Sequence, residues 1–287
     1  MILVTGASGL VGEAIFNYFS KHYKAIGTTH SVVDSRFTTL DLTKPLEVES
    51  FFEKKAIKAI IHCASKIPAR FKEAEDLKIY EANIKMVTNL LQNITKDVVF
   101  INISTCSLYT LKTSAKLNEQ SSVECNTFYQ LSKKHSEDML QLFYKNTRKL
   151  LNLRISSPYA INRESDTILY KFIKSALKKN VIELWGSGQR RQAFTNVETF
   201  AISVKELYDK NINGDFNYLT TNSISMLELA EKVKKYKEDL NIEKVEKLDP
   251  EEKCQTSFDL AKVAQFITVE DSLDKDISKI ISERLTK

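Results

Sequence analysis

The stretch "TGASGLVG", residues 5–12, decides the fold that we expect for this chain. An apolar run at Ile2–Val4 before it predicts a strand, and helical spacing after it predicts a helix. Gly6, Gly9 and Gly12 allow a tight turn and let the backbone approach a pyrophosphate closely. A helix that begins there offers unpaired N–H groups and a dipole that favours phosphate. The stretch therefore predicts a dinucleotide-binding loop between the first strand and the first helix.

Strand and helix patterns alternate outward from this loop to about residue 157. Apolar runs predict further strands at residues 24–29, 58–65, 97–104 and 150–157, and helices are expected at Pro45–Lys54, at Lys72–Ile94 and around Tyr129. Near-continuous apolar strands are typical of a parallel sheet that is buried on both faces. The alternation predicts an α/β fold, a doubly wound parallel Rossmann sheet with helices on both faces.

The alternation weakens in the second half, which predicts a smaller C-terminal substrate-binding lobe. Expected elements there are a helix at Thr167–Lys179, a strand at Val181–Leu184, one strand at "FNYLTT" (residues 216–221) and a helix after Ser225. The charged run that begins at Glu231 is interpreted as the surface of a solvated helix, and the remaining C-terminal residues as helical but less regular. We expect a dinucleotide-binding domain at residues 1–157, with returns near 192–222, and a substrate lobe at residues 158–191 and 223–287.

The composition is that of an ordinary globular protein. Of its 287 residues, 43% are hydrophobic and 28% are charged, which suits a chain with a full core. The net charge is +5 and both signs are interspersed, so we expect no nucleic-acid partner. No apolar run predicts a membrane span. The four cysteines form no CxxC pair and the first residues show no signal peptide; we therefore expect reduced thiols, no metal site and a cytoplasmic location.

Tyr129 and Lys133 lie four residues apart in an expected helix, so their side chains share one face. A tyrosine hydroxyl normally loses its proton near pH ~10. An ammonium group beside it favours the phenolate and lowers the pKa of the phenol. The pair is either a general acid/base or simply a surface Tyr and Lys, and the spacing alone leaves both interpretations open.

The spacing of the three glycines, G-x-x-G-x-x-G, resembles that of the extended short-chain dehydrogenase/reductase family, which includes the NAD-dependent epimerases and dehydratases that modify nucleotide sugars. Further segments resemble motifs of this family in the same order, up to about residue 201. They are "LDLT" (40–43), "HCAS" (62–65), Asn83, "STCSLY" (104–109), "YQLSK" (129–133), "RISSPYA" (154–160) and "GSGQRRQAFTNVETFA" (186–201).

The resemblance implies roles for three catalytic residues. Tyr129 would be the acid/base, Lys133 would lower its pKa and hold the nicotinamide ribose, and Thr105 would hydrogen-bond the reacting oxygen. It implies further that a larger set binds the dinucleotide: Gly6, Ser8, Gly9, Leu10, Val11, Gly12, His30, Ser31, Arg36, Asp41, Leu42, Cys63, Ala64, Ser65, Asn83, Tyr129, Lys133 and Ser156. The substrate would be bound by Lys66, Thr105, Ser157, Arg190 and Arg191.

The end of the second strand bears on the choice of cofactor. An acidic residue there would bind the ribose 2′-hydroxyl of NAD, but residues 27–31 read "GTTHS", with Arg36 nearby. This pattern favours NADP over NAD. Two alternatives remain: His30 and Arg36 are solvated loop residues, or Asp34 reaches the ribose.

The chain also departs from parts of the family pattern. Cys106 and Ser107 stand where 4,6-dehydratases have Asp and Glu, which argues against dehydration. Cys106 is either a reactive thiol or a small buried residue. His135 shares a helical face with apolar residues, which favours a core or interface histidine over a base.

The resemblance implies an NAD(P)-dependent epimerase or keto-reductase that acts on a nucleotide diphosphate sugar in cell-surface polysaccharide synthesis, and a homodimer. Two other functions stay open: a reductase of a non-nucleotide carbonyl compound, and a catalytically silent NAD(P)-sensing regulator.

Overall fold

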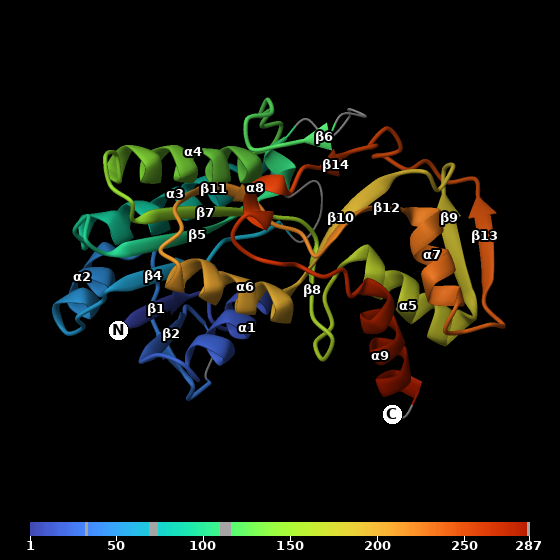
Figure 1. The fold of residues 1–287 in the computed structure, drawn as a ribbon, viewed down its shortest axis with the longest axis horizontal. Coiled ribbons are helices and arrows are strands. Elements are labelled where there is room, and N and C mark those ends of the chain that lie inside the picture. The colour runs from blue at the N-terminus through green and yellow to red at the C-terminus, as the bar shows by residue number, and fades with distance from the viewer. Residues whose placement is uncertain (32–33, 69–73, 110–115, 286–287) are drawn as a thin grey trace.

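A seven-stranded, fully parallel sheet forms the larger part of the molecule (Figure 1). The computed structural model describes residues 1–31, 34–68, 74–109 and 116–285. The strand order is β11-β7-β5-β4-β1-β2-β3, so the order reverses between β1 and β4 and the predicted doubly wound sheet is confirmed. In chain order the strands are β1 (Ile2–Thr5), β2 (Ala25–Thr29), β3 (Phe37–Thr39), β4 (Ala59–His62), β5 (Val99–Thr105), β7 (Leu150–Ile155) and β11 (Gly214–Asn217).

Helices cover both faces of this sheet. Phe19 of α1 and Leu207 of α6 are fully buried in the core on one face, and Leu90 of α3 and Leu140 of α4 in the core on the other, which α2 also covers. The bounds are α1 (Leu10–Phe19), α2 (Pro45–Glu53), α3 (Leu77–Gln92), α4 (Phe128–Phe143) and α6 (Val197–Asp209). The start that we predicted for α3, at residue 72, lies outside the described residues.

A smaller lobe with its own apolar core lies at one end of the large sheet (Figure 1). It is built on two small sheets, ordered β8-β10-β12 and β9-β13. Its elements are β8 (Pro158–Tyr159), α5 (Ile168–Lys179), β9 (Val181–Trp185), β10 (Arg191–Asn196), β12 (Thr221–Ser225), α7 (Met226–Lys234), β13 (Asn241–Val245) and α9 (Leu273–Leu285). The remaining elements are a 3₁₀ turn, η2 (Cys106–Leu108), the paired strands β6 (Lys116–Leu117) and β14 (Ser257–Phe258), and the short α8 (Ala261–Ala264), which packs on the large sheet.

Two of the sequence-based predictions are wrong in the second half of the chain. The segment 216–221 is not one strand, because the chain leaves the large sheet at Asn217 and enters the small sheet at Thr221. The segment looked like one strand because both of its parts are buried. The charged run after Glu231 is not one helix, because α7 ends at Lys234 and β13 then pairs in parallel with β9.

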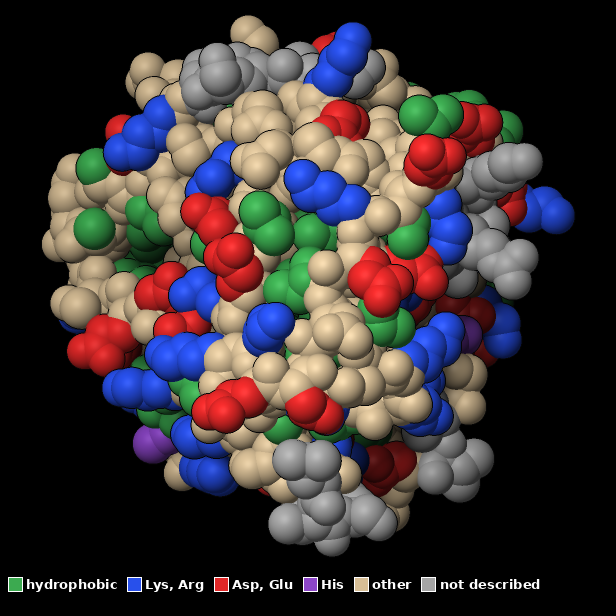
Figure 2. Space-filling model, turned by 90° about the vertical axis from the view of Figure 1, so that its right-hand side faces the viewer, with side chains coloured by type: hydrophobic (Ala, Val, Ile, Leu, Met, Phe, Trp, Pro, Cys, Tyr) green, Lys and Arg blue, Asp and Glu red, His purple; other side chains and the backbone are tan. Residues whose placement is uncertain are grey.

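The proposed division into two domains has one unforeseen contact. Val263 and Ile267, which fall in the predicted substrate lobe, pack in the core of the large sheet beside α6. Figure 2 shows the end of the molecule that carries β13 and α7, where Lys and Arg side chains are interspersed with Asp and Glu. Among the helices of the described segments, none is both long enough and apolar enough to cross a bilayer.

The packing of α6 on the large sheet can be tested with a matched pair of variants. Leu207→Ala removes a fully buried side chain and should lower the free energy of unfolding by about 2–5 kcal/mol, because it leaves a cavity. Ile202→Ala on the same helix removes a side chain that is 41% exposed, and should change stability by about 0.5 kcal/mol or less. Urea denaturation measures both, and similar losses for the two variants would contradict this packing.

Candidate active site

The glycine loop packs too tightly for side chains at two of its positions. Gly6 has a φ of +65°, and a Cβ atom there would lie 2.7 Å from the backbone of Ala64. A Cβ atom on Gly12 would lie 2.1 Å from the carbonyl oxygen of Gly6. Gly9 is exposed and lies at the N-cap position, directly before α1, and in the described segments no side chain caps the N–H groups of that helix. The loop is therefore an open cradle at a helix N-terminus, which fits the pyrophosphate of a dinucleotide.

Side chains around the loop fix its position. The Ser8 hydroxyl hydrogen-bonds the Thr29 hydroxyl at the end of β2, at 2.8 Å. Leu10 and Val11 are half-buried in the first turn of α1. The guanidinium of Arg163, a residue that the sequence analysis did not single out, donates to the carbonyl oxygen of Ser8 at 3.0 Å.

The residues expected near the adenosine half of the cofactor are mostly exposed. His30 and Ser31 are exposed, and Leu42 is buried in the core. Asp41 accepts hydrogen bonds from the Thr43 backbone and hydroxyl, at 2.9 and 2.7 Å, and so holds the turn before α2.

Arg36 is engaged by carboxylates in this structure. Its Nη2 atom lies 2.8 Å from Asp34 and 2.9 Å from Glu13. The hydrogen bonds from Arg36 also lower the pKa of Asp34. A 2′-phosphate would therefore have to displace these two carboxylates to pair with Arg36, which weakens the case for NADP.

The segment after β4 is tied to the neighbouring elements. The Thr5 hydroxyl hydrogen-bonds Nδ1 of His62 at 2.9 Å and accepts the N–H of Ala64 at 3.2 Å. Burial lowers the pKa of His62 to about 3 and raises the pKa of Cys63 to about 12, so both groups are neutral at pH 7. Asn83 accepts the N–H of Lys66 at 2.7 Å.

Asn83 acts as a clamp in this structure. Its Nδ2 group donates to the Lys66 carbonyl at 3.2 Å and to the Ser132 hydroxyl of α4 at 2.9 Å, and its Oδ1 atom also accepts from Ser65 at 3.4 Å. The amide is thus occupied by protein groups, and its evident role is to join the segment after β4 to α4. The side chain of Lys66 itself is exposed.

The three predicted catalytic residues lie at adjoining ends of β5 and α4. Thr105 ends β5, and its hydroxyl donates to the Ser107 hydroxyl at 3.0 Å and accepts the Ser107 N–H at 3.1 Å. Gln130, beside Tyr129, donates to the Ser107 carbonyl at 2.8 Å and so joins the start of α4 to the turn after β5. Lys133 is buried, and its Nζ atom donates to the Ile103 carbonyl of β5 at 3.0 Å.

The protonation of this pair differs from the sequence-based expectation. Burial raises the pKa of Tyr129 to about 12, and no lowering by Lys133 accompanies it. Burial lowers the pKa of Lys133 to about 8. The expected phenolate therefore does not follow from this chain alone, because desolvation of the phenol dominates.

A stripe of polar side chains on α4 contacts three successive strands. At intervals of four residues after Tyr129, Lys133 contacts β5 as described, Glu137 contacts β7, and Gln141 donates to Asp215 of β11 at 2.8 Å. Glu137 and Arg154 form a buried two-pronged ion pair, with N–O distances of 2.7 and 3.0 Å. The stripe fixes how α4, and with it Tyr129 and Lys133, lies across the sheet.

Arg154 extends this network toward the turn after β5. Its Nη1 atom donates to the Tyr109 hydroxyl at 2.6 Å, and that hydroxyl donates to Asn217 at 2.7 Å. Cys106 is buried, its thiol donates to the Arg154 carbonyl at 3.3 Å, and burial raises the pKa of that thiol. Of the two interpretations of Cys106, the structure supports the small buried residue.

The two predicted substrate-binding arginines are engaged within the protein. Arg190 pairs with Asp249 at 2.8 Å and with Glu251 at 3.0 Å. Arg191 donates to the Ser223 carbonyl at 2.6 Å and pairs with Glu228 at 3.3 Å.

Around the expected substrate site, Ser156 is half-buried, and Ser157 has a φ of +38° and accepts a hydrogen bond from Gln192. The imidazole of His135 hydrogen-bonds the Tyr80 hydroxyl of α3 at 3.0 Å, as expected for a packed histidine.

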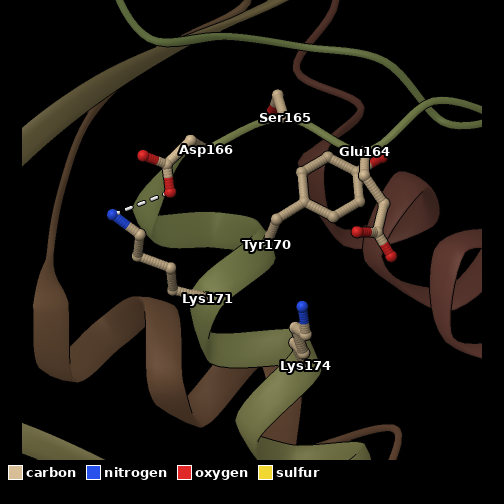
Figure 3. Close-up of a pocket in the computed structure, with 6 residues that line it drawn as sticks. All are labelled: Glu164, Ser165, Asp166, Tyr170, Lys171 and Lys174. Atoms are coloured by element: carbon tan, nitrogen blue, oxygen red, sulfur yellow. Dashed lines mark ion pairs between the residues drawn. The ribbon is translucent and has the colours of Figure 1, made fainter. Parts of the chain in front are cut away.

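One pocket of the described structure is lined by none of these residues. It has a volume of about 420 Å³, and its lining carries both signs of charge (Figure 3). The lining residues are Glu164, Ser165, Asp166, Tyr170, Lys171 and Lys174, at and before the start of α5. Because it contains none of the predicted groups, we do not assign the reaction to it.

Residues 2–217 match the family model described as the NAD dependent epimerase/dehydratase family. The chain belongs to this family. Membership confirms the resemblance found in the sequence and supports the predicted nicotinamide dinucleotide cofactor.

Among similar members, a UDP-glucuronate 4-epimerase from Thermodesulfobacterium geofontis is 24% identical over 277 residues, covering 85% of this chain and 84% of that protein. A dTDP-D-glucose 4,6-dehydratase from Dictyostelium discoideum is 22% identical over 81% of this chain, which spans only 61% of that longer protein. The crystal structure of the Bacillus cereus UDP-glucuronic acid 4-epimerase, in complex with UDP-glucuronic acid and NAD, superposes with a TM-score of 0.82 at 22% identity and covers 99% of both chains. This last likeness shows that the fold is shared.

The anchoring of α4 by Glu137 can be tested against its neighbour in the chain. Glu137→Gln leaves Arg154 without a charged partner in the core and should lower the free energy of unfolding by about 3–5 kcal/mol. Asp138→Asn makes the same chemical change one position later, at a side chain that is 48% exposed, and should cost about 0.5 kcal/mol or less. Urea denaturation compares them, and equal losses would show that the buried pair does not anchor the helix.

Proposed function

We propose that this family member is an NAD-dependent epimerase or keto-reductase that acts on a nucleotide-activated sugar. The observation that carries the proposal is the joining of the start of α4, which bears Tyr129 and Lys133, to the end of β5, which bears Thr105, by the Lys133–Ile103 and Gln130–Ser107 hydrogen bonds, on a sheet whose glycine loop fits a dinucleotide. Cys106 and Ser107 offer no carboxylate for eliminating water, so we do not propose dehydration.

The cofactor, when bound, supplies a nicotinamide that accepts or donates a hydride. Tyr129 would move the proton at the oxygen of the reacting carbinol, and Thr105 would hydrogen-bond that oxygen. Lys133 has three N–H donors, of which one is used by Ile103 among the described residues. The other donors would hold the ribose hydroxyls, and the positive charge would favour the phenolate of Tyr129 once the site is assembled.

We propose NAD as the cofactor, in place of the NADP that the sequence favoured. The family description names NAD, and Arg36 is held by Asp34 and Glu13. An arginine that already has two carboxylate partners gains less from a 2′-phosphate than a free one does.

A non-nucleotide carbonyl compound is the second candidate substrate. It is favoured by the internal pairing of Arg190 and Arg191, the residues expected to meet a sugar diphosphate. A thermal-shift panel of nucleotide sugars with NAD present separates the two candidates, because a ligand that binds only the folded state raises its melting temperature.

Four further expectations stay predictions: the silent regulator, the homodimer, the cytoplasmic location and a role in polysaccharide synthesis.

The role of Tyr129 is tested by removing its hydroxyl. Tyr129→Phe keeps the ring but deletes the proton donor, so kcat should fall on the order of 10²–10⁴-fold with cofactor affinity nearly unchanged. Thr105→Ala loses one hydrogen bond to the reacting oxygen and should show a smaller loss of kcat. Steady-state kinetics on the sugar found by the panel measure both. Wild-type turnover in Tyr129→Phe would refute the acid/base role and leave the silent regulator as an explanation.

Lys133 should couple cofactor binding to pH. Its pKa is about 8, so the ammonium is present below pH 8 and lost as the pH rises through that value. Cofactor affinity of the wild type should therefore weaken above about pH 8. Lys133→Met should bind the cofactor weakly at every pH and show no such step. NADH titrations from pH 6 to about pH 10 measure this, and an unchanged step in the variant would assign the titration to another group.

Cofactor choice should depend on the partners of Arg36. The wild type should bind NADH more tightly than NADPH. Asp34→Asn frees part of the Arg36 guanidinium, so NADPH affinity relative to NADH should rise roughly tenfold. The control is Asp239→Asn, the same change in an exposed ion pair of the smaller lobe. Fluorescence titration gives both affinities, and tighter NADPH binding by the wild type would restore the NADP assignment.

A further inference from the structure

Arg163 links the smaller lobe to the glycine loop. It lies in the connection between β8 and α5, yet its Nη1 atom donates to the carbonyl oxygen of Ser8 at 3.0 Å and to the Glu13 carboxylate of α1 at 2.5 Å. Through these two contacts, a cation of the smaller lobe lies beside the glycine loop.

The charged side chains beside the glycine loop balance one another in this structure. The N-terminus of α1 is the positive end of a helix dipole, and Arg163 adds a full positive charge beside it. Glu13 offsets this charge, but the same carboxylate also pairs with Arg36, which in turn pairs with Asp34. Two arginines thus share two carboxylates, so the group carries no net formal charge, and the positive end of the helix dipole remains available to a phosphate.

The segment that carries Arg163 is held in place from its other side. Glu164 pairs with Arg284 of α9, and Asp166 pairs with Lys171 of α5 at 2.9 Å, as Figure 3 shows for the second pair. The Arg163 side chain itself is 46% exposed. The backbone is therefore positioned by two ion pairs while the guanidinium stays accessible to a ligand.

We propose that Arg163 is a binding residue for the pyrophosphate of the dinucleotide, supplied by the smaller lobe. When the dinucleotide binds, the guanidinium exchanges the Glu13 carboxylate for phosphate oxygens, which suit its planar fork of N–H donors. This contact holds the smaller lobe against the bound cofactor and slows its release. A retained cofactor is what an epimerase requires, since an epimerase regenerates its cofactor in each turnover. The inference rests on the proposed dinucleotide binding.

The experiment measures NADH binding to the full-length protein by stopped-flow fluorescence. Arg163→Gln should raise the Kd by about ten- to hundredfold, mainly through faster dissociation, because one charge-assisted contact is lost. Arg163→Lys keeps the charge without the fork and should recover part of the affinity. The control Arg148→Gln changes an exposed arginine between α4 and β7, outside the segment that carries Arg163, and should leave the Kd within about twofold. An unchanged Kd and dissociation rate in Arg163→Gln would overturn the inference.

A double-mutant cycle with Glu13 separates direct contact from a secondary effect. If Arg163 only neutralises Glu13, the loss of Arg163 leaves an unpaired carboxylate that repels phosphate. In that case the double variant Arg163→Gln/Glu13→Gln should bind NADH with the same Kd as the single variant Glu13→Gln. If Arg163 contacts the pyrophosphate, the double variant should bind at least about tenfold more weakly than Glu13→Gln. The first result overturns the inference and the second supports it.

Failure of the proposed function would give a different pattern. A wild type that binds no NADH or NADPH in the same assay refutes dinucleotide binding itself. A wild type that binds NADH, with Arg163→Gln indistinguishable from it, refutes only the role of Arg163.

Discussion

The buried ion pair between Glu137 and Arg154 is the constraint on which the rest of the site depends. Two charges inside a core are costly unless each is fully paired, and here Arg154 meets both oxygens of Glu137 and the hydroxyl of Tyr109. Since these partners sit on α4, on β7 and after η2, the pairing allows one placement of α4 on the sheet. Tyr129 is two turns before Glu137 on the same face, so this placement sets where its hydroxyl lies relative to the end of β5.

The glycine loop and α4 belong to one connected frame. Gly6 lies against the backbone of Ala64, and the segment after β4 is clamped by Asn83, which also holds Ser132 beside Lys133. A shift of α4 would therefore be transmitted to the segment that faces the glycine loop. The strand order reverses between β1 and β4, and this is where an open α/β sheet leaves a crevice for a ligand.

The two arginines expected near a substrate are paired within the smaller lobe. Arg190 and Arg191 satisfy carboxylates of the lobe, and Gln192 reaches toward Ser157. The arginines thus hold the loop together, and the guanidinium that reaches the other lobe is Arg163.

The sequence by itself determined the strand–helix alternation, the glycine loop, and the shared helical face of Tyr129 and Lys133. These follow from local rules, because periodicity, glycine spacing and the i, i+4 relation act over a few residues. The tertiary structure decided the partners of Arg36, Arg163, Arg190 and Glu137, the clamp made by Asn83, the split of residues 216–221 between two sheets, and the raised pKa of Tyr129. Glu137 had a local signal in its spacing from Tyr129, but its partner Arg154 did not. The ion pairs that charged side chains form, and the pKa values of buried groups, depend on burial and on neighbours from distant segments. No local sequence pattern encodes either.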